Sequence, residues 1–468
     1  MSNGVNENTK RLPSNSTEHR SSDRTIRTER PFLERLFQSF TVPGAAQRTS
    51  SIKDARRAIA LCHTLLAERG EVSVTRLAAE AVSAYRALDP AALDVFFDAT
   101  VDEFSPDAEL VRQAADAYRD APSQTTLITL QAAVESPRQE LFRRFNMVPG
   151  GTAALVQMRG QILRTLNEHP ERSGLDADLA HLLRSWFNRG FLTLQRIDWR
   201  TPALVLERLI QYEAVHQIQG WRDLRRRLEA DRRCYAFFHP ALPDEPLIFI
   251  EVALTRRIAA NVQPLLDADA PVTDPGLADC AVFYSITNCQ SGLRGVSFGN
   301  FLIKQAVEDL RREFRRLRIF ATLSPIPGFV EWLTTSVGER RSTEFREFVR
   351  RVVDGVPPAD NRASEQRSRE LTALCAYYLL RAKRKSHPLD AVARFHLANG
   401  ARLERLNWMS DTSKAGMDQS FGLTANYVYR PAEVERNHES YAKTGRIVAS
   451  HDLEKLAQRI SDGKTAIA

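Results

Sequence analysis

The sequence has no long apolar run. A helix that spans a bilayer needs ~18 consecutive apolar residues, and the longest stretch here, PLIFIEVAL at residues 246–254, is interrupted by Glu251. The first 30 residues mix Arg with Glu and Asp and contain no apolar segment of the signal-peptide kind, and the final TAIA matches no receptor-read address. We therefore expect a soluble, cytoplasmic protein that does not contact membranes.

Cysteine is scarce as well. The chain has five, an odd number, and no two form a CxxC pair, which argues against both a disulfide framework and a structural zinc site. Three lie in apolar stretches, where a buried and inert thiol is expected. The ten histidines form no HExxH motif and no cluster with the cysteines, and there is no EF-hand loop. The sequence therefore predicts no metal site.

Lysine is rare too. Of 65 basic residues only nine are Lys, so 56 are Arg, and 58 acidic residues leave a net charge of +7. Because Arg binds phosphate in a planar, bidentate manner, a nucleic-acid partner has to be considered. The basic runs, such as RRRLEADRR, are instead interleaved with acidic residues and lack the exposed aromatics of RNA-binding surfaces. We interpret them as solvated helix faces and expect no nucleic-acid partner.

The chain is long enough for two domains, with 468 residues of which 43% are apolar. Residues 1–30 are rich in Ser, Asn, Thr and Arg and predict a disordered arm. Across 31–189, Ala, Leu and Arg recur at spacings of three and four, which is typical of amphipathic helices. Residues 190–468 carry strand patterns as well. We expect an α+β protein with an all-α helical N-terminal bundle followed by a mixed α/β domain.

Several segments of the second half predict strands that form a partly antiparallel sheet. Residues 232–239 and 247–254 read as a hairpin across the turn-rich PALPDEP. Residues 280–287 and 318–323 flank an amphipathic helix at 300–317, and this order predicts a βαβ unit with parallel strands. A last strand pair is expected at 402–409 and 425–429.

The segment NCQSGLRGVSFGN, residues 288–300, lies between a predicted strand and its crossover helix. Its glycines at 292, 295 and 299 free the backbone for close approach, and the helix N-terminus that follows favours anions, so a phosphate cradle and a plain Gly-rich connector are both open. The segment matches neither a Walker A motif nor a Rossmann fingerprint. It also contains GVSFG, a literal GxSxG, but the polar loop before it disfavours a nucleophile elbow at Ser297.

Two further residues are candidates for catalysis. Ser324 directly follows a predicted parallel strand, at the end where ligands bind in α/β sheets, and SPIPGF fixes its backbone; alternatively it only caps the next helix. His396 stands between apolar neighbours before an Asn-Gly turn, where a histidine that simply fills the core is the more common case.

Taken together and in order, these segments resemble the malonyl-CoA decarboxylase family. The motifs that carry the resemblance are RRCYAFFHPALPDEPLIFIEVALT (232–255), FYSITNCQSGLRGVSFGNFLIKQAVEDL (283–310), TLSPIPGF (322–329), FHLANGARLERLNWMSD (395–411) and GLTANYVYR (422–430). The resemblance implies a catalytic domain with the fold of GNAT-type acyltransferases at 190–468. It also implies that the helical domain at 31–189 serves self-association, as a dimer or tetramer.

The resemblance assigns site residues as well. In such enzymes the CoA pyrophosphate rests on backbone N–H groups between two splayed strands, at the start of the crossover helix. The implied CoA-binding residues are Arg294, Gly295, Val296, Ser297, Phe298, Gly299 and Asn300. The family's catalytic residues fall on Ser324 and His396, and its supporting residues on Tyr429 and Ser285. Animal members carry Glu at the position of Ser297, so the role of that carboxylate does not transfer to this chain.

The implied reaction converts malonyl-CoA to acetyl-CoA and CO2, through an enolate that hydrogen-bond donors stabilise and that is then protonated at carbon. We expect His396 to donate to the thioester oxygen and Ser324 to serve the carboxylate and the proton path, or the reverse. No metal, pyridoxal or biotin is needed. Such an activity belongs to fatty acid metabolism, either in malonate use or in the control of malonyl-CoA. The alternatives are an acyl-CoA acyltransferase of the same fold, a serine thioesterase using Ser297, and a non-catalytic helical scaffold.

Overall fold

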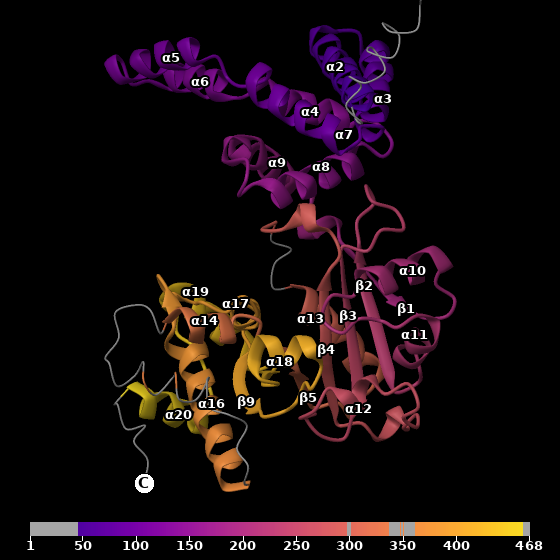
Figure 1. Cartoon of the computed structure of the whole chain (residues 1–468), viewed down its shortest axis with the longest axis vertical. Helices are drawn as coiled ribbons and strands as arrows, with labels where there is room; N and C mark the ends of the chain where they lie inside the picture. Colours follow the sequence, from indigo (N-terminus) through magenta and orange to yellow (C-terminus); the bar gives the residue numbers. More distant parts are fainter. Residues whose placement is uncertain (1–44, 297–300, 337–346, 348–349, 351–360, 462–468) are drawn as a thin grey trace, which may run out of the picture.

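Figure 1 shows the computed structural model of the chain, which describes residues 45–296, 301–336, 347, 350 and 361–461. The arm predicted at residues 1–30 lies outside these described residues. The helical region (indigo to purple in Figure 1) comes first and the sheet follows it. Within the described ranges, we find no helix that is both long enough and apolar enough to span a membrane.

The helical region folds as the period of its apolar residues predicts. Its helices are α2 (Ala45–Ala67), α3 (Glu71–Arg86), α4 (Pro90–Glu103), α5 (Ala108–Asp120), α6 (Gln124–Val134), α7 (Pro137–Asn146), α8 (Gly151–Thr165) and α9 (Ser173–Trp186). Side chains that cap helix ends set several starts: Asp89 accepts from the N–H of Ala92, and Asp107 from that of Glu109. A core that includes Phe142 and Leu155 holds α2, α3, α4, α7, α8 and α9 together, and in the described part of the chain α5 and α6 contribute no residue to it.

The second region is built on one mixed sheet. In the described part of the chain the strands run in the order β1-β2-β3-β4-β5-β10-β6, with β9 also paired to β10. Their bounds are β1 (Thr193–Ile197), β2 (Arg232–Phe238), β3 (Ile248–Thr255), β4 (Cys280–Asn288), β5 (Ile319–Thr322), β6 (Ser324–Pro325), β9 (Arg402–Asn407) and β10 (Thr424–Tyr429). Only β4 and β5 are parallel, as the predicted βαβ unit requires, and the other pairs are antiparallel.

Helices cover both faces of the sheet. The remaining helices are α10 (Ala203–Tyr212), α11 (Trp221–Arg227), α12 (Gln263–Leu266), α13 (Phe301–Glu313), α14 (Phe329–Ser336), α16 (Asn361–Arg381), α17 (Ala391–Ala398), α18 (Lys414–Ser420), α19 (Val434–Thr444) and α20 (His451–Ser461). Along β2, Tyr235 and Phe237 pack toward α13, whereas Cys234, Ala236 and Phe238 pack toward α10 and α11. Because helices cover both faces, β2 and β3 are buried at nearly every position, and most of their residues are apolar.

The mixed α/β prediction is confirmed, and so are the predicted hairpin, crossover unit and final strand pair. The sequence analysis missed β1 and β6, and also the short pair β7 (Lys383–Arg384) and β8 (His387–Pro388). β1 reads TLQRI and is largely exposed at the edge of the sheet, so no continuous apolar pattern marks it. The other three are two residues long, which is too short for a period-2 pattern.

Candidate active site

The site lies where two neighbouring strands separate. β4 and β5 pair in parallel from Cys280 and Ile319 to Phe283 and Thr322, after which β4 continues beside β3 alone. A cavity of about 240 Å³ opens at the point of separation. It is lined by Val215, Ile248, Phe283, Tyr284, Ser285, Ile286, Asn288, Leu323, Ser324, Pro325, Ala391, Val392, Phe395 and His396. Three of the four predicted catalytic or supporting residues, Ser285, Ser324 and His396, therefore face one cavity.

Ser324 is held in a short strand rather than at a helix cap. It pairs with Ala425 of β10, and its hydroxyl donates to Thr322 Oγ1 over 2.8 Å. Thr322 is itself fixed by β10, because its hydroxyl oxygen accepts from the N–H of Tyr427 and its carbonyl from the amide of Asn426. The hydroxyl oxygen of Ser324 lies 3.0 Å from His396 Nε2. The side chain is thus aligned by two strands and the imidazole.

His396 is brought to Ser324 by α17, whose first turn is capped by Asp390. Its ring is buried and stacks on Tyr427 with 4.6 Å between the ring centroids. The second ring nitrogen, Nδ1, lies 2.7 Å from the hydroxyl of Tyr429. The predicted supporting tyrosine therefore contacts the imidazole directly and completes a row Tyr429–His396–Ser324–Thr322.

The row fixes the tautomer of the imidazole. Burial lowers the pKa of His396 to about 3 and raises that of Tyr429 well above its usual value, so the ring is neutral and the phenol keeps its proton. Since the Ser324 hydroxyl donates to Thr322, its oxygen is free to accept from Nε2–H. Nδ1 is then the acceptor of the Tyr429 proton, and the donors of Tyr429, His396 and Ser324 each have an acceptor. Nε2–H is the donor that His396 presents beside the cavity.

Ser285 has a partner that the sequence analysis missed. Its hydroxyl lies 2.9 and 2.8 Å from the two carboxylate oxygens of Glu213, at the end of α10, and Thr287 donates to the same carboxylate over 3.2 Å. Glu213 also accepts from the backbone N–H groups of Val215 and His216. The hydroxyl proton of Ser285 is therefore committed to Glu213, and its lone pairs remain for the cavity. A lone Glu among apolar residues gives no sequence signal for this role.

A second buried carboxylate lies beside this pair. Glu251 of β3 is opposite Ser285 in the sheet register and accepts from Arg227 over 2.8 Å. Burial raises its pKa to about 8, although Arg227 acts in the opposite direction. Burial also lowers the pKa of His216 to about 4. Glu251 is therefore a buried carboxyl group, opposite Ser285, whose pKa lies far above the usual range.

The Gly-rich segment follows β4 directly, between that strand and α13. Backbone hydrogen bonds from Leu293, Arg294 and Val296 to carbonyls three residues earlier wind it into tight turns. Gly295 adopts a left-handed conformation with φ +76°, which favours glycine. Val296 is buried in the core. The remaining predicted CoA-binding residues, Ser297, Phe298, Gly299 and Asn300, lie outside the described residues, and so does the GVSFG serine of the elbow hypothesis.

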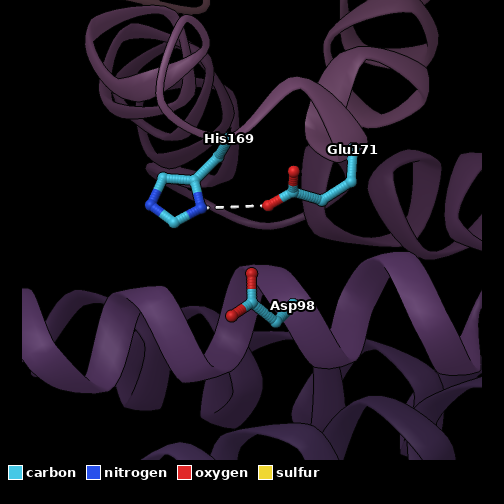
Figure 2. Close-up of side chains that lie close together, drawn as sticks. All are labelled: Asp98, His169 and Glu171. Carbon is cyan, nitrogen blue, oxygen red and sulfur yellow. Dashed lines mark hydrogen bonds and ion pairs between the residues drawn. The ribbon is translucent and has the colours of Figure 1, made fainter.

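One group of side chains in the described part of the chain has the spacing of a metal site. Figure 2 shows Asp98 of α4 facing His169 and Glu171, with candidate ligand atoms within 4.8 Å of one another. His169 Nδ1 is bonded to Glu171 over 2.9 Å, and Asp98 accepts from the buried Arg172 over 2.7 Å. The Arg172 guanidinium would repel a cation, so we interpret the group as an ion-pair cluster of the helical region.

The neutral imidazole predicts an unusual pH profile. Because burial lowers the pKa of His396 from 6.5 to about 3, the activity of this site should show no inflection near pH 6.5. In Glu251→Gln, which removes the opposing effect of the raised Glu251 pKa, the protein should lose stability as the pH falls below 6.5, where the unfolded chain takes up the proton. An inflection near pH 8 should come from Glu251 and disappear in Glu251→Gln. Steady-state kcat and thermal unfolding measured from pH 5 to 9 test this. An acidic limb of kcat centred near 6.5 in folded protein would contradict it.

The chain is similar in sequence to known proteins over most of its length. Residues 190–466 match the family model of the malonyl-CoA decarboxylase C-terminal domain, and residues 104–187 that of the malonyl-CoA decarboxylase N-terminal domain. The mitochondrial malonyl-CoA decarboxylase of Anser anser anser is 36% identical over 349 residues, 68% of this chain and 69% of the relative. That of Rattus norvegicus is 36% identical over 353 residues, 69% and 72% of the two chains.

Solved structures give a similar result. The crystal structure of malonyl-CoA decarboxylase from Rhodopseudomonas palustris is 47% identical, has a TM-score of 0.81 and covers 86% of this chain and 99% of its own. The enzyme from Agrobacterium vitis is also 47% identical, with a TM-score of 0.78 and the same two coverages. Both of these enzymes share the fold of this chain over most of its length.

Proposed function

This chain belongs to the malonyl-CoA decarboxylase family, and we propose that Ser324 and His396, in the cavity between β4 and β6, carry out its reaction. The enzyme converts malonyl-CoA to acetyl-CoA and CO2. The observation that carries the assignment of these residues is the buried row Tyr429–His396–Ser324, which ends in the cavity where the strands separate.

The reaction needs hydrogen-bond donors more than it needs an acid. Loss of CO2 from a malonyl thioester leaves an enolate with its charge on the former thioester oxygen, so the thioester itself is the electron sink. A donor aimed at that oxygen before the reaction contributes on the order of 3 kcal/mol. Nε2–H of His396 is such a donor: it is neutral, it is oriented by Tyr429, and it lies in a buried site where the interaction is strong.

The reaction also needs one proton at carbon. We assign its last transfer to the Ser324 hydroxyl, which gives its proton to the enolate carbon as it takes one from a water molecule that enters from solvent. The hydroxide that remains leaves the cavity and is neutralised by solvent. Ser285 is suited to hold that water, because its hydroxyl proton is donated to Glu213 and its oxygen remains free to accept a hydrogen bond. Proton delivery of this kind contributes about two to four orders of magnitude in rate.

One assay separates this proposal from its alternatives. The purified protein is incubated with malonyl-CoA, and CO2, acetyl-CoA and free CoA are quantified. Acetyl-CoA and CO2 in equal amounts support the proposal. Free CoA and malonate would support a serine thioesterase, and product formation only in the presence of an amine would support an acyltransferase.

We also propose that the enzyme self-associates through α5 and α6. These two helices extend away from the rest of the helical region in Figure 1, and in them only Ala114 is buried. Leu110, Ile128 and Val134 are 56%, 55% and 49% exposed on these two helices, and exposed large apolar side chains of this kind can mark a contact surface. A second copy of the chain is the partner that the family resemblance implies.

The expected cytoplasmic location and the domain limits at 30 and 189 stay predictions.

Two charges placed on this hairpin should prevent the association. In the double variant Leu110→Glu/Ile128→Glu we expect the molar mass from light scattering to fall toward that of a single chain, because two buried carboxylates would be needed to form the contact. kcat should stay within about threefold, since the cavity is remote from the hairpin. Val72→Glu is the matched control, because Val72 is 85% exposed on α3, outside the hairpin. An unchanged mass in the double variant would refute the proposed surface.

A further inference from the structure

The helical region contacts the Gly-rich segment through α8. The two backbones approach so closely that a Cβ on Gly292 would lie 1.8 Å from the carbonyl oxygen of Val156. A Cβ on Gly160 would lie 2.8 Å from the hydroxyl of Ser291. Two glycines, one in each region, therefore permit a direct contact between a helix of the first region and the segment predicted to bind CoA.

Arg159 of α8 makes the polar part of this contact. Its side chain is 5% exposed, and its Nε donates to Asp176 of α9 over 2.8 Å. Its Nη1 donates to the carbonyl oxygens of Gly292 and Arg294 over 2.7 and 2.8 Å. The carboxylate of Asp176 compensates the charge, so the guanidinium acts as a fork that holds two carbonyl groups of the segment.

Holding the carbonyls also orients the N–H groups. In a trans peptide the C=O and the following N–H point in opposite directions, so the N–H groups of Leu293 and Gly295 are directed away from Arg159. That of Leu293 donates to the carbonyl of Gln290 over 3.0 Å. That of Gly295 has no acceptor among the described residues, and among these residues, apart from its two chain neighbours, no atom lies within 4 Å of where a Cβ of Gly295 would be. An N–H at a left-handed glycine with no acceptor among the described residues can donate to a phosphate oxygen.

We infer that Arg159 is a positioning residue for CoA: it fixes the peptide planes at Gly292 and Arg294, so that the N–H of Gly295 faces the diphosphate of bound malonyl-CoA. The inference rests on the proposed function, because it takes CoA as the ligand of this segment. Under this inference, the affinity for the substrate depends on Arg159, a residue of the helical region that does not touch the substrate.

The test compares two substrates in Arg159→Met. For malonyl-CoA we expect KM to rise at least tenfold with kcat within threefold, since the diphosphate loses an oriented donor but the cavity is unchanged. For malonyl-pantetheine, which has no diphosphate, kcat/KM should stay within twofold. A side chain that only stabilised the fold would change both substrates alike. Arg159→Lys should resemble Arg159→Met, because an ammonium cannot bridge Asp176 and two carbonyls.

Arg138→Met is the matched control. Arg138 is equally buried in the helical region and donates to Asp178 over 2.6 Å and to Ser105 over 2.8 Å. Its loss should lower the melting temperature about as much as the loss of Arg159, without changing KM for malonyl-CoA. If Arg159→Met does not fold, Gly292→Ala is the second variant. Its added Cβ would clash with the carbonyl of Val156 in α8 and so displace the same segment, and it should show the same selective rise in KM.

Two results would overturn the inference: an unchanged KM for malonyl-CoA in folded Arg159→Met, or equal losses of kcat/KM for both substrates. Calorimetric titration with CoA distinguishes a failure of the positioning role of Arg159 from a failure of the proposed function. If the wild-type enzyme does not decarboxylate malonyl-CoA, the proposed function fails. The positioning role then stands if Arg159→Met weakens CoA binding tenfold, and it falls if CoA binds the two proteins equally.

Discussion

His396→Ala is expected to lower kcat for malonyl-CoA by about three orders of magnitude or more, the largest single effect in this enzyme. The substitution removes the donor to the enolate oxygen, which alone is worth about two to three orders. It also removes the group that aligns Ser324, because the 3.0 Å contact to the Ser324 hydroxyl is lost. KM should change by less than about fivefold, since His396 faces the thioester cavity and not the Gly-rich segment.

Stopped-flow or coupled measurement of acetyl-CoA formation tests this, and His239→Ala is its control. His239 is also buried, and it packs on Phe187 with 4.5 Å between the ring centroids and caps a turn outside the cavity. Its loss should reduce the melting temperature but not kcat. His396→Gln should recover part of the lost rate, because the amide can still donate. A rate near that of wild type in His396→Ala would show that another group faces the enolate oxygen.

Ser324→Ala is expected to give the second largest effect, a loss of about two to three orders of magnitude in kcat. The hydroxyl is the proposed last carrier of the proton to carbon, and general acid catalysis of this kind is worth two to four orders. The loss should be smaller than for His396→Ala because the Nε2–H donor remains and can still stabilise the enolate. A solvent isotope effect on kcat should therefore rise, since unassisted protonation becomes the slow step.

The control for this variant is Ser136→Ala, which removes an equally buried hydroxyl that donates to Asp178 over 2.7 Å in the helical region. It should leave kcat within about twofold. Ser297→Ala tests the thioesterase alternative directly. If that variant alone abolishes turnover and accumulates no product while Ser324→Ala is active, the assignment of Ser324 is wrong.

Much of the fold followed from local patterns. The strand-like runs at 232–239 and 247–254 predicted two strands, and the turn-rich connector between them predicted their hairpin. The amphipathic helix between two strands predicted the parallel pair β4 and β5. β1 was not predicted, because an exposed edge strand carries no alternating or continuous apolar pattern.

Only part of the site could be predicted from the sequence. Ser324, His396, Tyr429 and Ser285 were predicted by the resemblance to a family, and the structure brings the first three into one hydrogen-bonded row. Glu213 and Arg159 were missed. Each is a charged residue of ordinary sequence context whose role depends on a partner that folding brings to it.

The sequence by itself determined the elements, because helix and strand periods, caps and turns depend on residues within about four positions of one another. The tertiary structure alone decided which polar groups meet. Ser324 and His396 are 72 residues apart in the chain, as are Ser285 and Glu213, and Arg159 is 133 residues from Gly292. It also decided the state of the imidazole, because the pKa of His396 is lowered by burial, and burial is supplied by side chains from several other elements.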